Sequence, residues 1–173
     1  IGGFDYPSIN KLINGAVDGA KSVNPDINIL ISYAGSWDDP VKGLELANAM
    51  IENGADVLFD RAAGTGIGVM KAAESAGVWG VGNVIPCSES FPTICLTSTD
   101  YLHAQIMQKV VDLHENGELT GGFFNWGIAA GAIDATDYHS DIPQEHVDYV
   151  NKIRQQIIDG EITVEESWVL KEY

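Results

Sequence analysis

The sequence has few positive charges. Its 173 residues include nine Lys and Arg against 25 Asp and Glu, which gives a formal net charge of −16 at pH 7. A field of this sign repels polyanions, so nucleic acid and anionic lipid are disfavoured as partners. Long apolar runs are also missing. No stretch of 18 apolar residues occurs, so the sequence predicts no membrane-spanning helix.

Cysteine is scarce as well. The chain has two, Cys87 and Cys95, in the stretch PCSESFPTIC. Two interpretations stay open: the pair closes a small loop in an oxidising compartment, or both remain as free buried thiols. Neither cysteine has histidine partners at metal-ligand spacing, which disfavours a zinc site.

Motifs of catalysis are absent too. No G-x-S-x-G nucleophile motif occurs, and the four histidines stand singly along the chain. The acidic stretch DATDYHSD (134–141) lacks the glycine and the terminal glutamate of an EF-hand, so we interpret it as a solvated loop. The sequence therefore predicts neither an enzyme nor a metal or cofactor.

Apolar segments alternate with amphipathic helices along the chain. Apolar spacing predicts a helix over 8–21, and Asp39 followed by Pro40 predicts the start of a helix that ends at Gly54. Thr65 is placed to cap a helix over 66–76. Two further helices are predicted over 100–115 and from Pro143, and five strands over 27–35, 55–60, 79–82, 91–97 and 121–129.

This alternation predicts an α/β fold, with helices on both sides of a mostly parallel sheet in three αβα layers. In such sheets ligands bind beyond the carboxyl ends of the strands. We therefore expect the ligand-binding loops at 33–39, 59–66, 82–90 and 125–139.

The glycine-rich turn AGTGIG (63–68) overlaps one of these expected ligand-binding loops, 59–66. Val69 stands where a dinucleotide fingerprint needs its third glycine, and no Gly-Lys-Ser/Thr follows, so a phosphate-binding loop is excluded. Two interpretations remain: a tight turn, or a cradle in which Gly64, Thr65 and Gly66 offer backbone N–H groups to an uncharged or mildly polar solute.

Four other side chains are candidates for ligand recognition. Trp37 follows the predicted strand 27–35 and either stacks on a planar ring or packs under its own loop. Asp60 and Arg61 stand at a strand end, where they contact a ligand or pair with each other. Asn83 follows the next strand and is a further polar candidate.

Two long segments together resemble one family. Residues 2–73, from GGFDYPSINK to GIGVMKAA, and the tail DIPQEHVDYVNKIRQQIIDGEITV (141–164) are similar to basic membrane protein lipoproteins, which include purine nucleoside receptors of ABC importers. The resemblance implies the type I periplasmic-binding-protein fold. It implies that 1–98 and 118–173 form most of the C-terminal lobe, and that 99–117 is a crossover helix that packs on an N-terminal lobe.

The same resemblance implies a partial chain. The N-terminal lobe would come from the rest of the protein or from a companion chain, and the full-length protein would be extracytoplasmic, lipid-anchored or periplasmic. It would deliver its ligand to the membrane subunits of an ABC importer.

Two departures from the family weaken its nucleoside specificity. An aspartate resembling a ribose-hydroxyl acceptor in nucleoside-binding relatives is missing from GVGNVIP (80–86), and Thr97 is the best match for a missing lysine. We therefore expect a receptor for a small ring-containing molecule, of which a nucleoside is one candidate. The alternative is a non-transporting sensor or structural lobe that pairs with another chain and binds little ligand.

Overall fold

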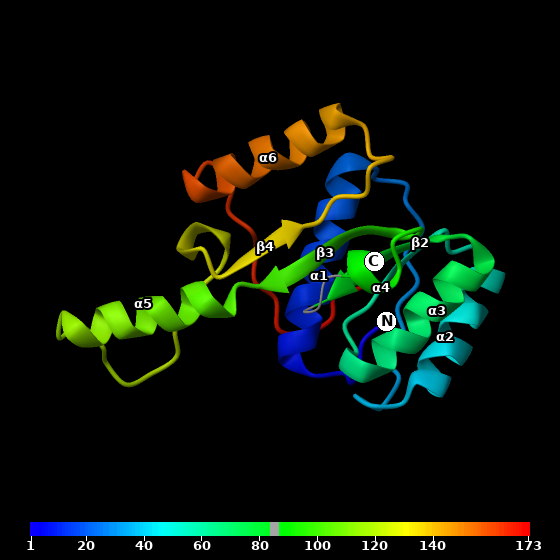
Figure 1. Cartoon of the computed structure of the whole chain (residues 1–173), viewed down its shortest axis with the longest axis horizontal. Coiled ribbons are helices and arrows are strands. Elements are labelled where there is room, and N and C mark those ends of the chain that lie inside the picture. Colours follow the sequence, from blue (N-terminus) through cyan, green and yellow to red (C-terminus); the bar gives the residue numbers. More distant parts are fainter. Residues whose placement is uncertain (84–86) are drawn as a thin grey trace.

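A four-stranded sheet forms the centre of the computed structural model, which describes residues 1–83 and 87–173 (Figure 1). The strand order is β1-β2-β3-β4. The strands β1 (Val57–Phe59), β2 (Trp79–Asn83) and β3 (Cys95–Tyr101) are parallel, and β4 (Ile133–Thr136) is antiparallel to β3. The predicted α/β class with a mostly parallel sheet is confirmed.

The helices α2 (Pro40–Glu52) and α3 (Gly66–Ala76) pack tightly together on one face of the sheet. Glycine permits this approach, since a Cβ added to Gly68 would lie 1.8 Å from the carbonyl oxygen of Pro40. The hydrophobic core lies between this helix pair and the strands, and its best-covered residues include Ala47, Leu58, Val69, Ala72, Ala73 and Cys95.

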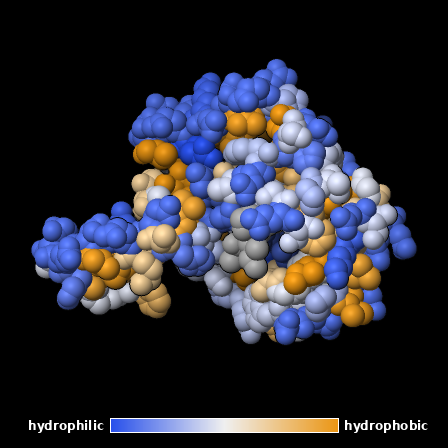
Figure 2. Space-filling view, in the orientation of Figure 1, coloured by the Kyte–Doolittle hydropathy of each residue, from blue (hydrophilic) through white to orange (hydrophobic). Residues whose placement is uncertain are grey.

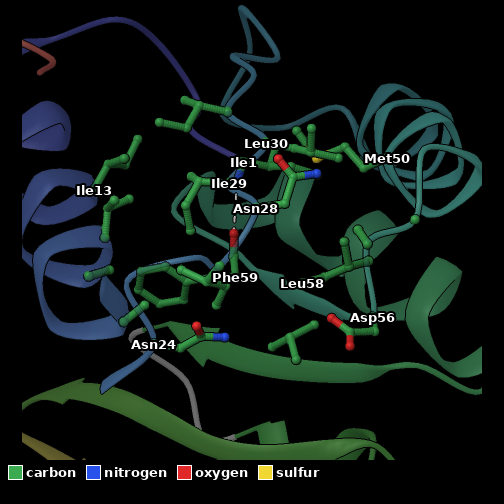
Figure 3. Close-up of a pocket in the computed structure, with 18 of the residues that line it drawn as sticks. Ile1, Ile13, Asn24, Asn28, Ile29, Leu30, Met50, Asp56, Leu58 and Phe59 are labelled. Carbon is green, nitrogen blue, oxygen red and sulfur yellow. Dashed lines mark hydrogen bonds between the residues drawn. The ribbon is translucent and has the colours of Figure 1, made fainter. Parts of the chain in front are cut away.

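The helix α1 (Pro7–Val23) lies on the other side of β1. In Figure 3 Ile13 of α1 approaches Phe59 from one side, while Met50 of α2 lies on the side of Leu58. The helix α6 (Gln144–Ile158) runs along β4, where Arg154 forms a salt bridge of 2.6 Å with Asp134. Helices therefore flank the sheet on both sides, as the three-layer prediction requires.

The helix α5 (His103–Glu115) projects from the body as an arm (Figure 1). None of its residues is buried, and Met107 and Val111 are exposed. Apolar atoms are visible on the arm in Figure 2. Two short elements, α4 (Cys87–Ser90) and η2 (Ile128–Ala130), complete the helical part, with η1 (Ala63–Thr65) directly before α3.

Helix predictions agree with the structure better than strand predictions. Asp39 caps α2 as expected, because its Oδ1 accepts a hydrogen bond of 3.0 Å from the backbone N–H of Lys42. Three strand assignments are wrong. The segment 121–129 forms no strand, part of the predicted acidic loop 134–141 forms β4, and the strand predicted over 91–97 lies at Cys95–Tyr101.

The predicted strand 27–35 is extended but mostly unpaired. Within it only Tyr33 forms a bridge, to Gly2. Apolar composition signals a strand buried on both faces, but a strand also needs a neighbour for its backbone groups, and composition does not show whether one is present.

The two cysteines are joined in a disulfide. Cys87 in α4 pairs with Cys95 in β3, with their Cα atoms 5.6 Å apart. The bond ties the segment after β2 to the start of β3, so the interpretation as two free thiols is wrong for this structure. Residues 84–86 of the predicted ligand loop 82–90 lie outside the described part of the chain.

Candidate functional site

The polar candidates lie where the parallel strands end. Asp60 and Arg61 directly follow β1, Asn83 is the last residue of β2, and Thr99 and Tyr101 lie in the last part of β3. Since parallel strands end at one edge of a sheet, residues distant in the sequence meet there. Arg61 and Asn83, two of the predicted site residues, contact each other directly.

Arg61 links the ends of three strands. Its guanidinium donates from Nη1 to Asn83 Oδ1 and to Thr99 Oγ1 at 3.0 Å, and from Nη2 to the Tyr101 hydroxyl at 3.2 Å. The side chain is only 5% exposed. Burial lowers the pKa of Arg61 from its ordinary value, while Tyr101 and Asp60 act in the opposite direction. A buried cation surrounded by neutral acceptors is costly, which marks this position as a candidate for ligand contact.

Asp60 does not form a salt bridge with Arg61 among the described residues. Successive strand residues point to opposite faces, so the two side chains diverge. The Asp60 carboxylate accepts a hydrogen bond of 2.7 Å from the N–H of Ala62 and lies against Gly66. Burial raises the pKa of Asp60 from 3.8 to about 6, although the Ala62 bond and nearby positive charges oppose the shift.

The predicted cradle at 63–68 makes several internal contacts. The N–H of Thr65 donates to the Trp37 and Ala62 carbonyls, and the N–H of Gly66 donates within the turn. A Cβ added to Gly64 would lie 2.9 Å from Asp38 Oδ1. The turn therefore packs against the loop that carries Trp37.

Thr65 does not cap α3 with its side chain, contrary to the sequence prediction. Its hydroxyl is fully buried, accepts a hydrogen bond of 2.9 Å from the N–H of Asp39 and donates to the Ser36 carbonyl at 3.2 Å. These bonds fix both sides of Trp37. Thr65 is thus a positioning residue for the tryptophan loop.

Trp37 belongs to a group of three aromatic rings. Its ring centroid lies 5.3 Å from that of Phe4 and 6.3 Å from that of Tyr6, and the rings of Phe4 and Tyr6 stack at 5.3 Å with an interplanar angle of 13°. Trp37 is 37% exposed and Tyr6 51%. The group therefore presents aromatic surface to solvent while its members support one another.

Gly3 contacts both Trp37 of the aromatic group and the backbone of Arg61. Its N–H donates to the Arg61 carbonyl at 3.1 Å, and a Cβ on Gly3 would lie 2.2 Å from the Trp37 ring. The absence of a side chain at position 3 lets the indole lie over the backbone beside Arg61.

Four residues of this region were missed by sequence reasoning: Phe4, Tyr6, Thr99 and Tyr101. Thr99 and Tyr101 lie in β3, but the sequence predicted that this strand ends at residue 97. Their position at the edge of the sheet was therefore not expected. The aromatic pair precedes α1 and could have been found from the alternation F-x-Y before a Pro at a helix start.

Among residues 1–83 and 87–173, no group of three His, Cys, Asp or Glu side chains is placed to hold a metal ion. In the same ranges, every helix is too short or too polar to cross a bilayer.

Two known proteins are similar to this chain in their structure. The crystal structure of a transcriptional activator of the comK gene from Bacillus halodurans superimposes with a TM-score of 0.80 at 25% identity, covering 88% of this chain and 54% of that one. An ABC transporter solute-binding protein from Conexibacter woesei DSM 14684 gives a TM-score of 0.76 at 19% identity, covering 92% and 54%. The second likeness shows a shared fold.

Similarity in sequence agrees with the fold. The ABC transporter nucleoside-binding protein BmpA of Lactococcus lactis subsp. cremoris (strain MG1363) is 32% identical over 189 aligned positions, covering 95% of this chain and 51% of the relative. The chain thus spans about half the length of that relative. The family model of PnrA-like ABC transporter substrate-binding proteins matches residues 1–167, and the chain belongs to this family.

Proposed function

We propose that this chain forms a ligand-binding lobe of an extracytoplasmic receptor, which delivers a small ring-containing molecule to an ABC importer. One observation carries the proposal: the exposed ring of Trp37 lies over Gly3, whose N–H donates to the carbonyl of the buried, hydrogen-bonded Arg61 at the carboxyl edge of a parallel sheet. This is where α/β folds bind ligands.

The residues divide into direct contacts and supports. Trp37 stacks on the ligand ring, and the Arg61 and Asn83 pair recognises its polar substituents. Asp60, Gly64, Thr65 and Gly66 form the turn beneath, which holds the Trp37 loop in place and brings the N-terminal end of α3 to the rim. A nucleoside fits this arrangement because it combines a planar base with hydroxyl groups.

The remaining parts of the receptor are supplied from outside residues 1–173. Residues 1–98 and 118–173 form the C-terminal lobe, and 99–117, which contains α5, crosses to pack on an N-terminal lobe. The exposed Met107 and Val111 support this assignment, since apolar surface on a projecting helix favours a covering partner.

The mode of action is binding without catalysis. The ligand is held between two lobes and shifts the receptor towards a closed form, which the membrane subunits of the importer recognise. Anchoring by lipid or release into a periplasm both keep such a receptor outside the cytoplasmic membrane.

Calorimetric titration of a protein that contains both lobes tests the proposal. Purine nucleosides, sugars and flavins are the ligand panel, and we expect saturable heat from a member with a planar ring. Heat from none of them would overturn the proposal. It would favour the alternative, a lobe that pairs with another chain and binds little ligand.

A further inference from the structure

Arg61 determines how the side chains around it are oriented. A guanidinium carries five N–H donors and no acceptor, so each hydrogen-bond partner must turn an acceptor atom towards it. Asn83 does so with Oδ1, Thr99 with Oγ1 and Tyr101 with its hydroxyl oxygen. The donor groups of these three side chains are therefore directed elsewhere.

Two of these donors have no acceptor among the described residues. They are Asn83 Nδ2 and the O–H of Tyr101, whereas the hydroxyl of Thr99 donates to the Gly82 carbonyl at 3.3 Å. Asn83 and Tyr101 are both partly exposed at the carboxyl edge of the sheet, and the Arg61 to which they bond is 5% exposed. This edge therefore presents two neutral donors beside a buried cation.

No carboxylate is hydrogen-bonded to the Arg61 guanidinium. Every Asp and Glu lies in the described part of the chain, since residues 84–86 are Val, Ile and Pro, and none of them forms a salt bridge with Arg61. Asp60 and Asp100 are the acidic residues next to the site in sequence, and alternation along the strands directs both carboxylates to the other face of the sheet. Asp60 still attracts Arg61 through space, but the face with the free donors has no acidic side chain from these strands.

We propose that the ligand of this site carries a carboxylate, which accepts hydrogen bonds from Asn83 Nδ2 and the Tyr101 O–H and is paired electrostatically with the buried Arg61. This ligand class rests on the proposed function, because it specifies the small molecule that the receptor holds. The two oxygens of a carboxylate only accept, and the free groups of the site only donate. Hydrogen bonds to an ionised acceptor are also stronger than those between neutral groups.

Charge favours a carboxylate over the other oxygen groups of small molecules. A sugar hydroxyl can accept one of the two hydrogen bonds, but it leaves the charge of Arg61 without an anionic partner, which is costly for a buried cation. A phosphate monoester carries a charge of about −1.5 to −2 at pH 7, more than one guanidinium balances. The net charge of −16 of the chain disfavours that excess further.

The position of Trp37 indicates that the carboxylate is attached to a ring. The indole lies over Gly3, whose N–H donates to the Arg61 carbonyl at 3.1 Å. Stacking on Trp37 and hydrogen bonding at Asn83 and Tyr101 thus occur along one edge of the sheet. A cyclic or aromatic monocarboxylic acid can use both contacts.

Calorimetry with a protein that contains both lobes tests the proposal on matched pairs of ring compounds at pH 7. The pairs are adenosine and adenosine-5′-carboxylic acid, glucose and glucuronic acid, and benzamide and benzoic acid. We expect the carboxylate of at least one pair to bind at least about tenfold more tightly than its neutral partner, which still binds through its ring. Adenosine 5′-monophosphate should bind more weakly than adenosine-5′-carboxylic acid.

Two variants separate the carboxylate contact from the ring contact. Tyr101→Phe removes one donor and keeps the aromatic ring, so it should weaken binding of the carboxylate about tenfold and binding of the neutral partner much less. Arg61→Met removes the buried charge at similar side-chain length and should weaken the carboxylate at least as much. Tyr149→Phe, at an exposed position of α6, is the matched control and should bind as the wild type does.

The outcomes separate this proposal from the proposed function. Neutral members that bind as tightly as their carboxylate partners would overturn the carboxylate and leave the receptor function standing. A carboxylate preference that is unchanged in Tyr101→Phe would overturn the contact, and tighter binding of adenosine 5′-monophosphate would overturn the choice of a monoanion. Heat from no compound would overturn the receptor function and the carboxylate together.

Discussion

The carboxylate of Asp60 fills the space beside Gly66. A Cβ added to Gly66 would lie 2.1 Å from Asp60 Oδ2, and both residues are buried. A residue with a side chain at position 66, the start of α3, would therefore clash with the carboxylate of Asp60. Both residues support the turn that holds Trp37, so packing in the turn and the proposed ligand contact are linked.

Gly66→Ala should destabilise the fold. The added methyl group cannot avoid the buried carboxylate without displacing β1 or α3, and overpacking of this kind costs about 1–3 kcal/mol. Urea unfolding measures the loss. Gly15→Ala in α1 is the matched control, because nothing lies within 4 Å of its Cβ position. Its expected effect is neutral or stabilising, and an equal loss in both variants would contradict the close packing at Gly66.

Stability should fall as the pH rises from about 4 to about 6. Burial raises the pKa of Asp60 from 3.8 to about 6, so folding takes up a proton in this range and the protonated, more stable form is lost above it. The shift corresponds to about 3 kcal/mol. Unfolding free energies across this range for the wild type and Asp60→Asn measure it.

Asp60→Asn should remove this part of the pH dependence, since an amide does not titrate. The other 24 acidic residues also contribute to the pH profile, so the difference between the two proteins is the decisive quantity. Glu45→Gln, at an exposed position of α2, is the control. Parallel profiles for the wild type and Asp60→Asn would show that Asp60 is not buried as described.

Reduction of the Cys87–Cys95 disulfide should lower the unfolding free energy by about 2–3 kcal/mol, the value expected for a short closed loop. Urea unfolding with and without a phosphine reductant measures it. The double variant Cys87→Ser with Cys95→Ser should not respond to the reductant. Alkylation of two thiols in the unreduced, denatured protein would contradict the bond.

Met107→Glu should destabilise a protein that contains both lobes more than it destabilises residues 1–173 alone. Met107 is exposed on the projecting helix α5, and a partner lobe would bury the new charge at a cost of at least about 2 kcal/mol. Gln105→Glu adds the same charge at an exposed position on the opposite face of the helix and is the control. Equal losses in the short and the complete protein would argue against a lobe packed on α5.

The sequence was most informative where the signal is local. The cap at Asp39, the Pro at position 40 and the apolar spacing of 8–21 predicted α1 and α2 nearly to the residue, because helices depend on neighbours three or four positions away. The position of Arg61 and Asn83 at the carboxyl edge of the sheet was also predicted. Alternating strands and helices indicate parallel strands, and the carboxyl ends of parallel strands lie at the same edge.

Features that depend on distant partners were not predictable. The segment 27–35 has a strand's composition, but its pairing depends on what lies beside it. β4 was hidden because its residues Asp134 and Thr136 look like a polar loop, and their partners in β3 are remote in sequence. The role of Thr65 was missed for the same reason: its hydroxyl bonds to residues 36 and 39, not to its own helix.

The most direct measurement of the central claim is ligand affinity in Trp37 variants of a protein with both lobes. By calorimetry with the best ligand of the panel, Trp37→Ala should bind at least about tenfold more weakly, because a stacked ring contributes about 0.5–1.5 kcal/mol beyond the area it buries. Trp37→Phe should retain most of the affinity, and Trp168→Ala, at an exposed position near Lys11, should bind as the wild type does. Unchanged affinity in Trp37→Ala would contradict the proposed site.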